Sequence, residues 1–200
     1  MIRKPLYKVS RRVGEAIYSK TQTPKFAAHK AIERGRIQKH RSTRTEYGNQ
    51  LTEKQKIRLS YGIGEGAMRR IMQRTRKEKG APAELLMQNL ERRFDNVIYR
   101  SGLAKNRTQS RQIISHGHIL INGRISRSPS RLLRIHDAVS MRKQSEEKKS
   151  FIAITAVPKH VAPQWLSVDK GVATVRALPT LADADTTLAW SAVTDFYSRA

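Results

Sequence analysis

The stretch AELLMQNLERRFDNVIYR, residues 83–100, has the clearest helical periodicity in the chain and decides the fold class. Its apolar residues are spaced four, four and three apart, so a helix would gather them on one face: Leu86, Leu90, Phe94 and Val97. We therefore predict one amphipathic helix over this whole stretch. A helix of this length needs a partner for its apolar face, so we look for that partner in the residues that follow.

A second helix is expected directly after the first. Asn106 is followed three residues later by Gln109, which is the pattern of a capping box. This pattern predicts a helix over residues 107–115 whose apolar residues are Ile113 and Ile114. Gly117 is the residue expected to end it, because glycine adopts the left-handed conformation that often closes a helix.

A small β-element follows the second helix. Residues 119–121 are apolar, and the dipeptide Asn122-Gly123 suits a type I′ turn before a return strand at residues 124–125. Residues 138–142 alternate apolar and polar side chains, which predicts a further strand. The fold class is therefore α+β, with a two-helix and small-sheet module inserted into a mainly helical N-terminal body.

The charge of the chain limits the classes of function. Its 200 residues include 40 Lys and Arg against 16 Asp and Glu, a formal net charge of +24. Such a chain repels itself unless a polyanion neutralises it, so nucleic acid is the first partner to consider. An anionic membrane surface is a second possibility, and a merely solvated basic surface is a third. The absence of cysteine excludes disulfides and thiolate metal sites, and favours an intracellular compartment.

The charge is spread unevenly and suggests four segments. Residues 1–45 hold 13 basic and two acidic residues and are expected to form a basic arm, with short helical stretches, that becomes ordered against RNA. A helical body over 46–85 and the two-helix and small-sheet module over 86–145, which we expect to carry the binding surface, complete the basic part. Residues 146–200 follow, and the last fifty residues hold four basic and four acidic side chains. We expect this last segment to pack on the body or contact protein.

Enzymatic and metal-binding patterns are weak in this sequence. Residues 62–67 match a loose G-x-G-x-x-A pattern, but a charged stretch precedes them where a nucleotide-binding site needs a buried strand. The six histidines lack the spacing of a metal site, and no serine lies in a G-x-S-x-G elbow. We expect no catalytic residue, no metal and no cofactor.

The basic side chains are therefore the candidate functional residues. Arg107 and Arg111 are four residues apart and share a helical face. We expect both to join Arg92, Arg93 and Arg124 in one phosphate-binding surface, and charge reversal at Arg107 or Arg111 to leave the fold intact. The full set of candidate RNA-binding residues is Arg11, Arg12, Lys54, Lys56, Arg58, Arg69, Arg70, Arg92, Arg93, Arg100, Arg107, Arg111, His116, Asn122 and Arg124.

Several stretches closely resemble the bacterial family of small-subunit ribosomal protein four. The module carries LERRFDNVIYR at residues 90–100, RQIISH at 111–116 and INGR at 121–124. Outside it, the matches are Ser10-Arg11-Arg12, the region from Tyr47 to Gly62, and the C-terminal motifs PxWL at 163–166 and FYS at 196–198. The resemblance covers nearly the whole chain in the order of the family.

The resemblance implies a structural constituent of the small ribosomal subunit. Such a protein binds 16S ribosomal RNA early and nucleates assembly of the subunit body in the cytoplasm, although an organelle ribosome is also possible. With ribosomal proteins five and twelve it contributes to translational accuracy, and it lies near the messenger RNA entry path. Some members hold zinc through four cysteines, which this chain lacks. The alternative is an RNA-modifying enzyme or stress-related factor that uses the same module.

Overall fold

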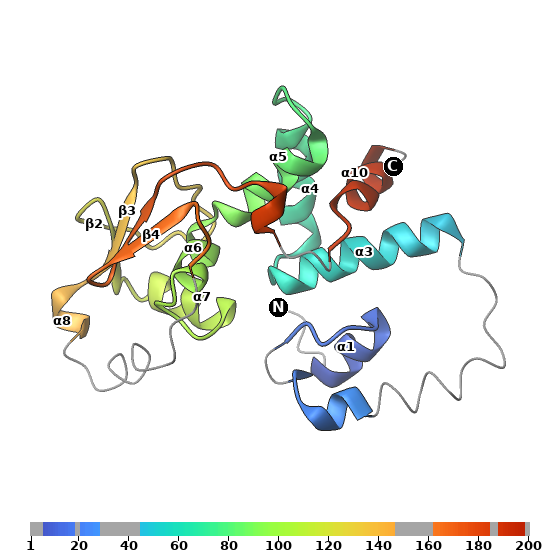
Figure 1. The fold of residues 1–200 in the computed structure, drawn as a ribbon, viewed down its shortest axis with the longest axis horizontal. Coiled ribbons are helices and arrows are strands. Elements are labelled where there is room, and N and C mark those ends of the chain that lie inside the picture. Colours follow the sequence, from blue (N-terminus) through green and yellow to red (C-terminus); the bar gives the residue numbers. More distant parts are fainter. Residues whose placement is uncertain (1–5, 19–20, 29–44, 147–161, 185–187, 199–200) are drawn as a thin grey trace. The chain divides into compact units, whose positions relative to one another are not determined.

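The computed structural model describes residues 6–18, 21–28, 45–146, 162–184 and 188–198 (Figure 1). The chain divides into two compact units. Unit 1 comprises Met1–Lys77 and Thr187–Ala200, and unit 2 comprises Glu78–Thr186. Helices dominate the first unit, and helices with a sheet form the second, so the predicted α+β class is confirmed.

Unit 1 is built around α3 (Glu46–Ser60), against which α10 (Trp190–Ser198) packs. The helical pattern expected around residues 46–80 is interrupted after Ser60, where Gly62 adopts a φ of +59° before α4 (Glu65–Thr75) begins. Many of the buried apolar residues of this unit lie in or directly after these three helices: Ile57, Tyr61, Met68, Met72, Trp190, Val193 and Phe196. Each helix therefore contributes apolar side chains to the core of the unit.

The N-terminal segment is folded over the part that the structure describes. Helix α1 (Leu6–Val13) buries Ser10 and Val13 and contacts α3. Ser10 Oγ donates a hydrogen bond to Thr21 Oγ1 at 3.2 Å, and Thr21 is itself buried. This part of the expected arm packs on α3. Residues 29–44 of the arm lie outside the described residues, so its expected ordering against RNA stays a prediction.

The prediction of a single helix over residues 83–100 is wrong. The chain forms α5 (Pro82–Glu91) and then α6 (Phe94–Arg100), with Arg93 extended between them at φ −63° and ψ 138°. The break occurs because residues distant in sequence supply backbone hydrogen bonds at this point: Phe94 N donates to Arg131 O at 2.8 Å. The apolar spacing does not reveal this break, because Leu90 and Phe94 are both fully buried on either side of it.

The second helix and the hairpin are as predicted. Helix α7 (Arg107–Ser115) begins at Asn106, whose Oδ1 accepts from Gln109 N at 2.9 Å. The return bond of the capping box differs, since Gln109 Oε1 accepts from Lys105 N rather than from Asn106 N. Gly117 ends the helix at φ +74°, and Asn122 and Gly123 have the positive φ values of a type I′ turn.

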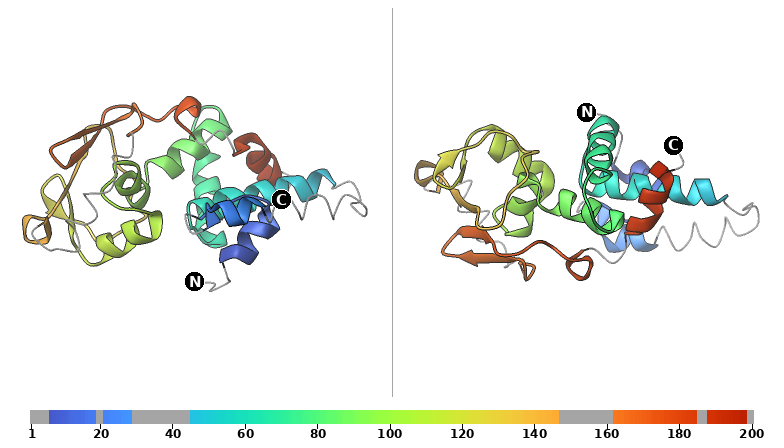
Figure 2. Two further views of the ribbon diagram at one scale, coloured as in Figure 1. Left: turned by 60° about the horizontal axis from the view of Figure 1, so that its bottom comes forward. Right: turned by 90° about the horizontal axis from the view of Figure 1, so that it is seen from above.

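The sheet of unit 2 is larger than the sequence predicts. Five strands in the described part of the chain form one sheet in the order β2-β1-β3-β5-β4, with every neighbouring pair antiparallel (Figure 1 and Figure 2). Their bounds are Ile119–Ile121 (β1), Arg124–Ile125 (β2), Ala138–Met141 (β3), Leu166–Asp169 (β4) and Val172–Val175 (β5). The short α8 (Lys143–Glu146) follows β3, and a turn of 3-10 helix (Leu181–Asp183) follows β5.

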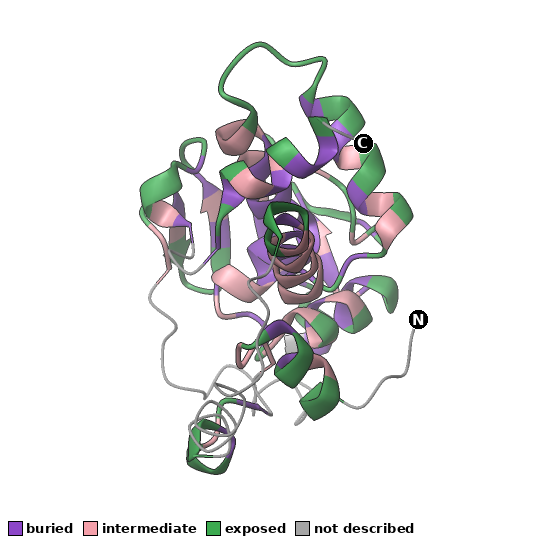
Figure 3. Cartoon of the chain, turned by 90° about the vertical axis from the view of Figure 1, so that its right-hand side faces the viewer, coloured by how far each residue is buried: buried purple, intermediate pink, exposed green. Residues whose placement is uncertain are grey.

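The C-terminal segment does not act as one piece, which corrects its expected packing on the body. Ala138 pairs with Thr174, and Val139 with Ala173, so β5 extends the sheet of the module. Trp165, Leu166, Ala173 and Val175 join the same core as α6, α7, β1 and β3, and the buried segments are purple in Figure 3. Only α10 belongs to the helical unit. Local sequence could not show this, because the pairing of β3 with β5 joins residues far apart in the chain.

Candidate nucleic-acid interface

Backbone hydrogen bonds from the loop at residues 129–133 determine where α5 ends and α6 begins. Arg93 forms an isolated antiparallel bridge with Leu132, and Leu133 N donates to Arg92 O at 2.9 Å. Asp95 N donates to Pro129 O at 3.0 Å, so the first N–H groups of α6 are satisfied by carbonyls rather than by a capping side chain. This arrangement brings the two arginines of the break beside the loop at residues 129–134.

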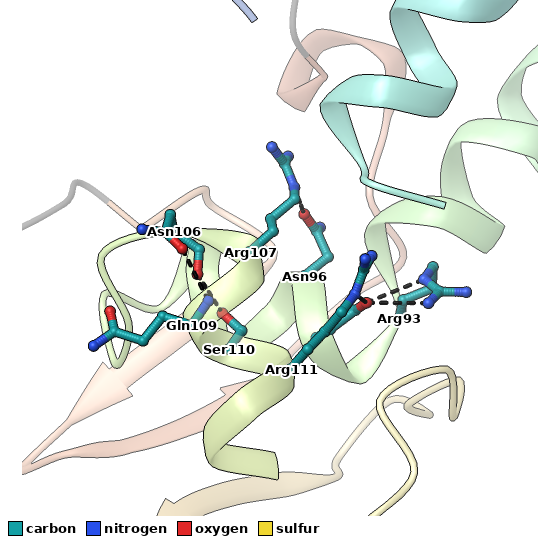
Figure 4. A network of polar contacts seen from close by, with 8 residues as sticks. Arg93, Asn96, Asn106, Arg107, Gln109, Ser110 and Arg111 are labelled. Carbon is teal, nitrogen blue, oxygen red and sulfur yellow. Dashed lines mark hydrogen bonds and ion pairs between the residues drawn. The ribbon is translucent and has the colours of Figure 1, made fainter. Parts of the chain in front are cut away.

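One buried carboxylate binds two of the candidate arginines. Asp95 is 1% exposed, and its two oxygens accept from Arg93 Nε and Nη2 at 3.1 and 3.0 Å. Asp95 Oδ2 also accepts from Arg111 Nε at 2.7 Å, which joins α6 to α7. Figure 4 shows Arg93 and Arg111 converging at this point. Arg93 itself is only 7% exposed, so its charge serves the fold rather than an open binding surface.

A second buried carboxylate orders the neighbouring side chains. Glu91 is fully buried and accepts from Arg100 Nε and Nη2 at 3.1 and 2.9 Å, and from Asn96 Nδ2 at 2.9 Å. Asn96 Oδ1 in turn accepts from Arg107 Nε at 2.8 Å (Figure 4). The Arg107 guanidinium lies 4.6 Å from the centroid of the Tyr99 ring, which is within cation–π range. Arg100 and Arg107 are thus held in place by residues of α5 and α6.

The structure therefore joins two of the five expected arginines at one carboxylate and gives the others separate contacts. Arg93 and Arg111 meet at Asp95, Arg107 lies one turn before Arg111 on α7, and Arg92 Nε donates to Leu133 O at 3.0 Å. Arg92, Arg107 and Arg111 stay partly exposed, whereas Arg93 is buried. No contact among the described residues joins Arg124 to this group. Arg124 is exposed at the start of β2.

Five arginines at the start of β2 and between β2 and α8 are exposed, and of these Arg124 alone was among the candidates predicted from the sequence. Their side chains have no hydrogen bond or ion pair with any of the residues that the structure describes, so their charge is available to a ligand. We call them the 124–142 arginines: Arg124, Arg127, Arg131, Arg134 and Arg142. The signal was present in the sequence, because five arginines occur within 19 residues without a helical pattern to explain them.

One of these arginines lies against the end of α7. A Cβ atom placed on Gly117 would lie 3.1 Å from Arg127 Nε, so the guanidinium lies on the glycine backbone. A cation at this position is stabilised by the negative end of the helix dipole. His116 is exposed next to it, and its ring stacks on that of His118 with centroids 6.0 Å apart. Arg127 and His116 therefore lie together at the C-terminus of α7.

Asn122 has a structural role that the sequence did not suggest. Its Nδ2 donates to Asp137 Oδ1 at 2.8 Å, and its Oδ1 accepts from Ala138 N at 2.8 Å. The other oxygen of Asp137 accepts from Arg134 N at 2.7 Å. The carboxamide thus fastens the hairpin turn to the start of β3. Both its nitrogen and its oxygen are used in hydrogen bonds within the chain.

The candidates in unit 1 divide in the same way. Arg11, Arg12, Arg69 and Arg70 are exposed on α1 and α4. Lys54 is 7% exposed, pairs with Glu65 at 2.9 Å and lies 4.3 Å from the centroid of the Phe196 ring, so it fastens α10 to α3. Lys56 pairs with Glu15 and Glu53 at 2.7 Å, and Arg58 donates to Gln55 Oε1 at 2.7 Å. The three basic residues of α3 are therefore paired within the chain.

The Glu65 carboxylate accepts hydrogen bonds from Lys54 and Tyr197. Burial alone would raise its pKa, but hydrogen bonds from Lys54 and Tyr197, with the charges of Lys54 and Arg58, lower that pKa below its ordinary 4.5. Burial and the hydrogen bond to Glu65 raise the pKa of Tyr197, so its hydroxyl stays protonated as a donor. For Lys56, burial lowers the pKa, but the bonds to Glu15 and Glu53 outweigh it and raise the pKa overall.

Two kinds of feature are missing from the described residues. They contain no group of three or more His, Cys, Asp or Glu placed to hold a metal ion. No helix among them is both long enough and apolar enough to cross a membrane.

Comparison with known proteins gives a consistent result along the chain. The family described as ribosomal protein S4/S9 N-terminal domain matches residues 2–91, and the S4 domain matches residues 92–139. Small ribosomal subunit protein uS4A of Symbiobacterium thermophilum is 38% identical over 98% of this chain and 97% of its own length. Small ribosomal subunit protein uS4 of Halothermothrix orenii is 39% identical over the same shares. That of Acidithiobacillus ferrooxidans is 42% identical over 78% of this chain and 76% of its own.

Proposed function

Since this chain belongs to the uS4 family of small ribosomal subunit proteins, we propose that the 124–142 arginines bind the phosphates of small-subunit (16S) ribosomal RNA. The protein is a structural constituent of the small ribosomal subunit and acts in translation. The family is a structural one rather than a family of enzymes. We infer that the molecular activity of the protein is binding of ribosomal RNA. The arrangement of the arginines supports two roles, since some stabilise the fold and others are exposed for contact with RNA.

These two roles follow from pairing and burial. A buried arginine that already shares a carboxylate gains little from a phosphate, because its charge is largely compensated. An exposed arginine without a partner offers a planar fork that can contact two phosphate oxygens at once. The 124–142 arginines have this second character. Arg92, Arg107 and Arg111 are partly exposed and are held in fixed directions, so we propose that they also contact RNA.

Unit 1 offers further contacts. Arg69 and Arg70 are exposed on α4, and Arg11 and Arg12 on α1. We propose that these residues also contact phosphates. Lys54, Lys56, Arg58, Arg93, Arg100 and Asn122 instead support the fold through the pairs described above.

The finer role rests on resemblance to the family. We propose that the protein binds the RNA early, nucleates assembly of the subunit body in a bacterial cytoplasm, and contacts ribosomal protein five. A contribution to accuracy with ribosomal proteins five and twelve, and a position near the messenger RNA entry path, belong to the same proposal. The high positive charge supports the RNA contacts, since phosphate contact is the largest part of such affinity.

The test uses the full chain and the 5′ domain of 16S RNA in the presence of excess transfer RNA. We expect the protein to bind the ribosomal RNA selectively and to sediment with small subunits after a moderate salt wash. The variant Arg124→Glu/Arg131→Glu/Arg134→Glu should lose most of this binding. Lys170→Glu is the matched control, because Lys170 is exposed in the charge-balanced C-terminal segment. Equal binding by both variants would contradict the assignment of these arginines.

A further inference from the structure

The dipeptide Asn122-Gly123 has a chemical property that its hydrogen bonds control. Asparagine followed by glycine is prone to deamidation, because glycine has no Cβ to hinder attack by its own backbone nitrogen. In that reaction Gly123 N loses its proton and bonds to Asn122 Cγ. The Cγ–Nδ2 bond breaks, and ammonia leaves with the proton. Water then opens the resulting succinimide ring to aspartate or isoaspartate, so no oxidant or cofactor is required.

The structure places this reactive carboxamide in a clamp. Nδ2 donates to Asp137 Oδ1 and Oδ1 accepts from Ala138 N, both at 2.8 Å. Asn122 N also donates to Ala138 O at 2.8 Å, so backbone and side chain are fastened to the same neighbour. Rotation of Cγ toward Gly123 N requires both side-chain bonds to break. The residue is exposed, so water can reach any succinimide that forms.

The product of deamidation would oppose the clamp. An aspartate at this position places a second carboxylate where Nδ2 now lies 2.8 Å from Asp137 Oδ1. Two such carboxylates repel each other, and neither offers the proton that the amide supplies. Isoaspartate would also add a backbone carbon to a two-residue turn whose φ values of 49° and 77° fit type I′.

We propose that Asn122 is a deamidation site that the folded module holds unreacted through Asp137 and Ala138, and whose reaction opens the hairpin. Chains with a loosened or unfolded module are modified, and the modification then prevents the hairpin from closing on β3. The extent of deamidation at Asn122 therefore depends on whether the module has remained folded. This inference concerns the chain itself and does not depend on which RNA it binds.

In the clamp, the amide of Asn122 donates to the carboxylate of Asp137, and exchanging these two groups between the positions tests the geometry. Asp137→Asn alone turns two amide groups toward each other, because the new carboxamide must use its one oxygen for Arg134 N and offer its nitrogen to Asn122 Nδ2. Asn122→Asp alone opposes two carboxylates. In Asn122→Asp/Asp137→Asn, the carboxamide at position 137 accepts from Arg134 N through its oxygen and donates through its nitrogen to the carboxylate at position 122. We expect each single variant to lower the midpoint of thermal unfolding, and the double variant to restore most of the loss.

The chemical test follows the modification itself. Wild-type protein, wild-type protein in urea and the folded Asp137→Asn variant are incubated at mildly alkaline pH, and the peptide that contains residue 122 is analysed by mass spectrometry. We expect slow modification of the folded wild type, a several-fold faster reaction in Asp137→Asn and the fastest reaction in urea. Equal rates in folded and unfolded wild type would overturn the proposal. If Asp137→Asn does not fold, the comparison of Asn122→Asp with the double variant tests the clamp. A double variant whose unfolding midpoint is no higher than that of Asn122→Asp would refute it.

These measurements stay separate from RNA binding. A protein that fails to bind 16S RNA but shows the expected rates and midpoints contradicts only the proposed function. A protein that binds RNA normally but reacts equally fast in the folded and unfolded states contradicts only the clamp.

Discussion

Asp95 Oδ2 and Arg111 Nε lie 2.7 Å apart and join α6 to α7 at a carboxylate that is 1% exposed. Arg93 binds the same carboxylate, so two arginines are compensated by one acid. The separation of Arg107 and Arg111 by four residues on α7 does not reveal this pair, because the spacing shows only that the two side chains share a helical face. A side chain on the polar face of a helix can still be part of the packing, if another element brings a buried acid to it.

Charge reversal at Arg111 is expected to destabilise unit 2, contrary to the hypothesis from sequence. Arg111→Glu places a second carboxylate beside Asp95 and should cost about 2 kcal/mol, less than the loss of a fully buried pair because Arg111 is partly exposed. Urea unfolding followed by tryptophan fluorescence measures it, since Trp165 lies in unit 2 and Trp190→Phe removes the other tryptophan. Arg124→Glu, the same change at an exposed arginine, should leave the free energy of unfolding within about 0.5 kcal/mol. Equal losses in both variants would contradict the Asp95 pairing.

The salt dependence of RNA binding should distinguish the two kinds of arginine. Each phosphate contact removed lowers the slope of log K against log salt by about 0.9 on duplex RNA regions, or about 0.7 on single strands. Arg131→Ala and Arg134→Ala should each produce a loss of this size without changing the circular dichroism spectrum. Arg100→Ala should instead lower stability, because Glu91 then stays buried without its arginine. If a folded Arg100→Ala variant instead lost about 0.7–0.9 of slope, as expected for a phosphate contact, the pair with Glu91 would not be the main role of Arg100.

Acid should weaken unit 1 through Glu65. Its pKa is lowered in the folded protein, so the stability that it contributes is present above its ordinary pKa of 4.5 and is lost as the pH falls below that value. Glu65→Gln removes this contribution, so the difference in unfolding free energy between wild type and variant should shrink as the pH falls from 6 toward 3. Tyr197→Phe, which removes one of the two hydrogen bonds, should show a smaller acid loss than wild type. Thermal unfolding at each pH, read from Trp190 in a Trp165→Phe background, measures the difference. A constant difference across this range would refute the argument.

Gly117 should not tolerate a side chain. It has a φ of +74° and supports the guanidinium of Arg127, so Gly117→Ala should cost about 1–2 kcal/mol through the left-handed conformation alone. Gly66→Ala is the opposite control, because Gly66 lies in the first turn of α4 and a Cβ there meets nothing within 4 Å. That change should stabilise the helix by no more than the roughly 0.5–1 kcal/mol that applies in a helix interior. Chemical denaturation of both variants measures the change in free energy of unfolding, which should be negative for Gly117→Ala and positive for Gly66→Ala. A Gly117→Ala protein as stable as wild type would contradict the role of Gly117 as the helix cap.

The sequence by itself determined the elements that depend on near neighbours. Asn106, Gly117 and the Asn122-Gly123 turn act within a few residues of themselves, so α7 and the β1–β2 hairpin lie where the pattern places them. The sign and excess of charge also follow directly from composition, and they favour a nucleic-acid partner.

Tertiary structure alone decided where the long helix breaks and which arginines keep their charge for a ligand. The break at Arg93 depends on the carbonyls of Pro129 and Arg131, and the enlarged sheet depends on pairing of Ala173 with Val139. In the sequence, a buried acid such as Asp95 is indistinguishable from an ordinary charge among arginines. Only packing shows that water is excluded there, and exclusion of water is the reason that the pair belongs to the core while Arg124 stays exposed to solvent.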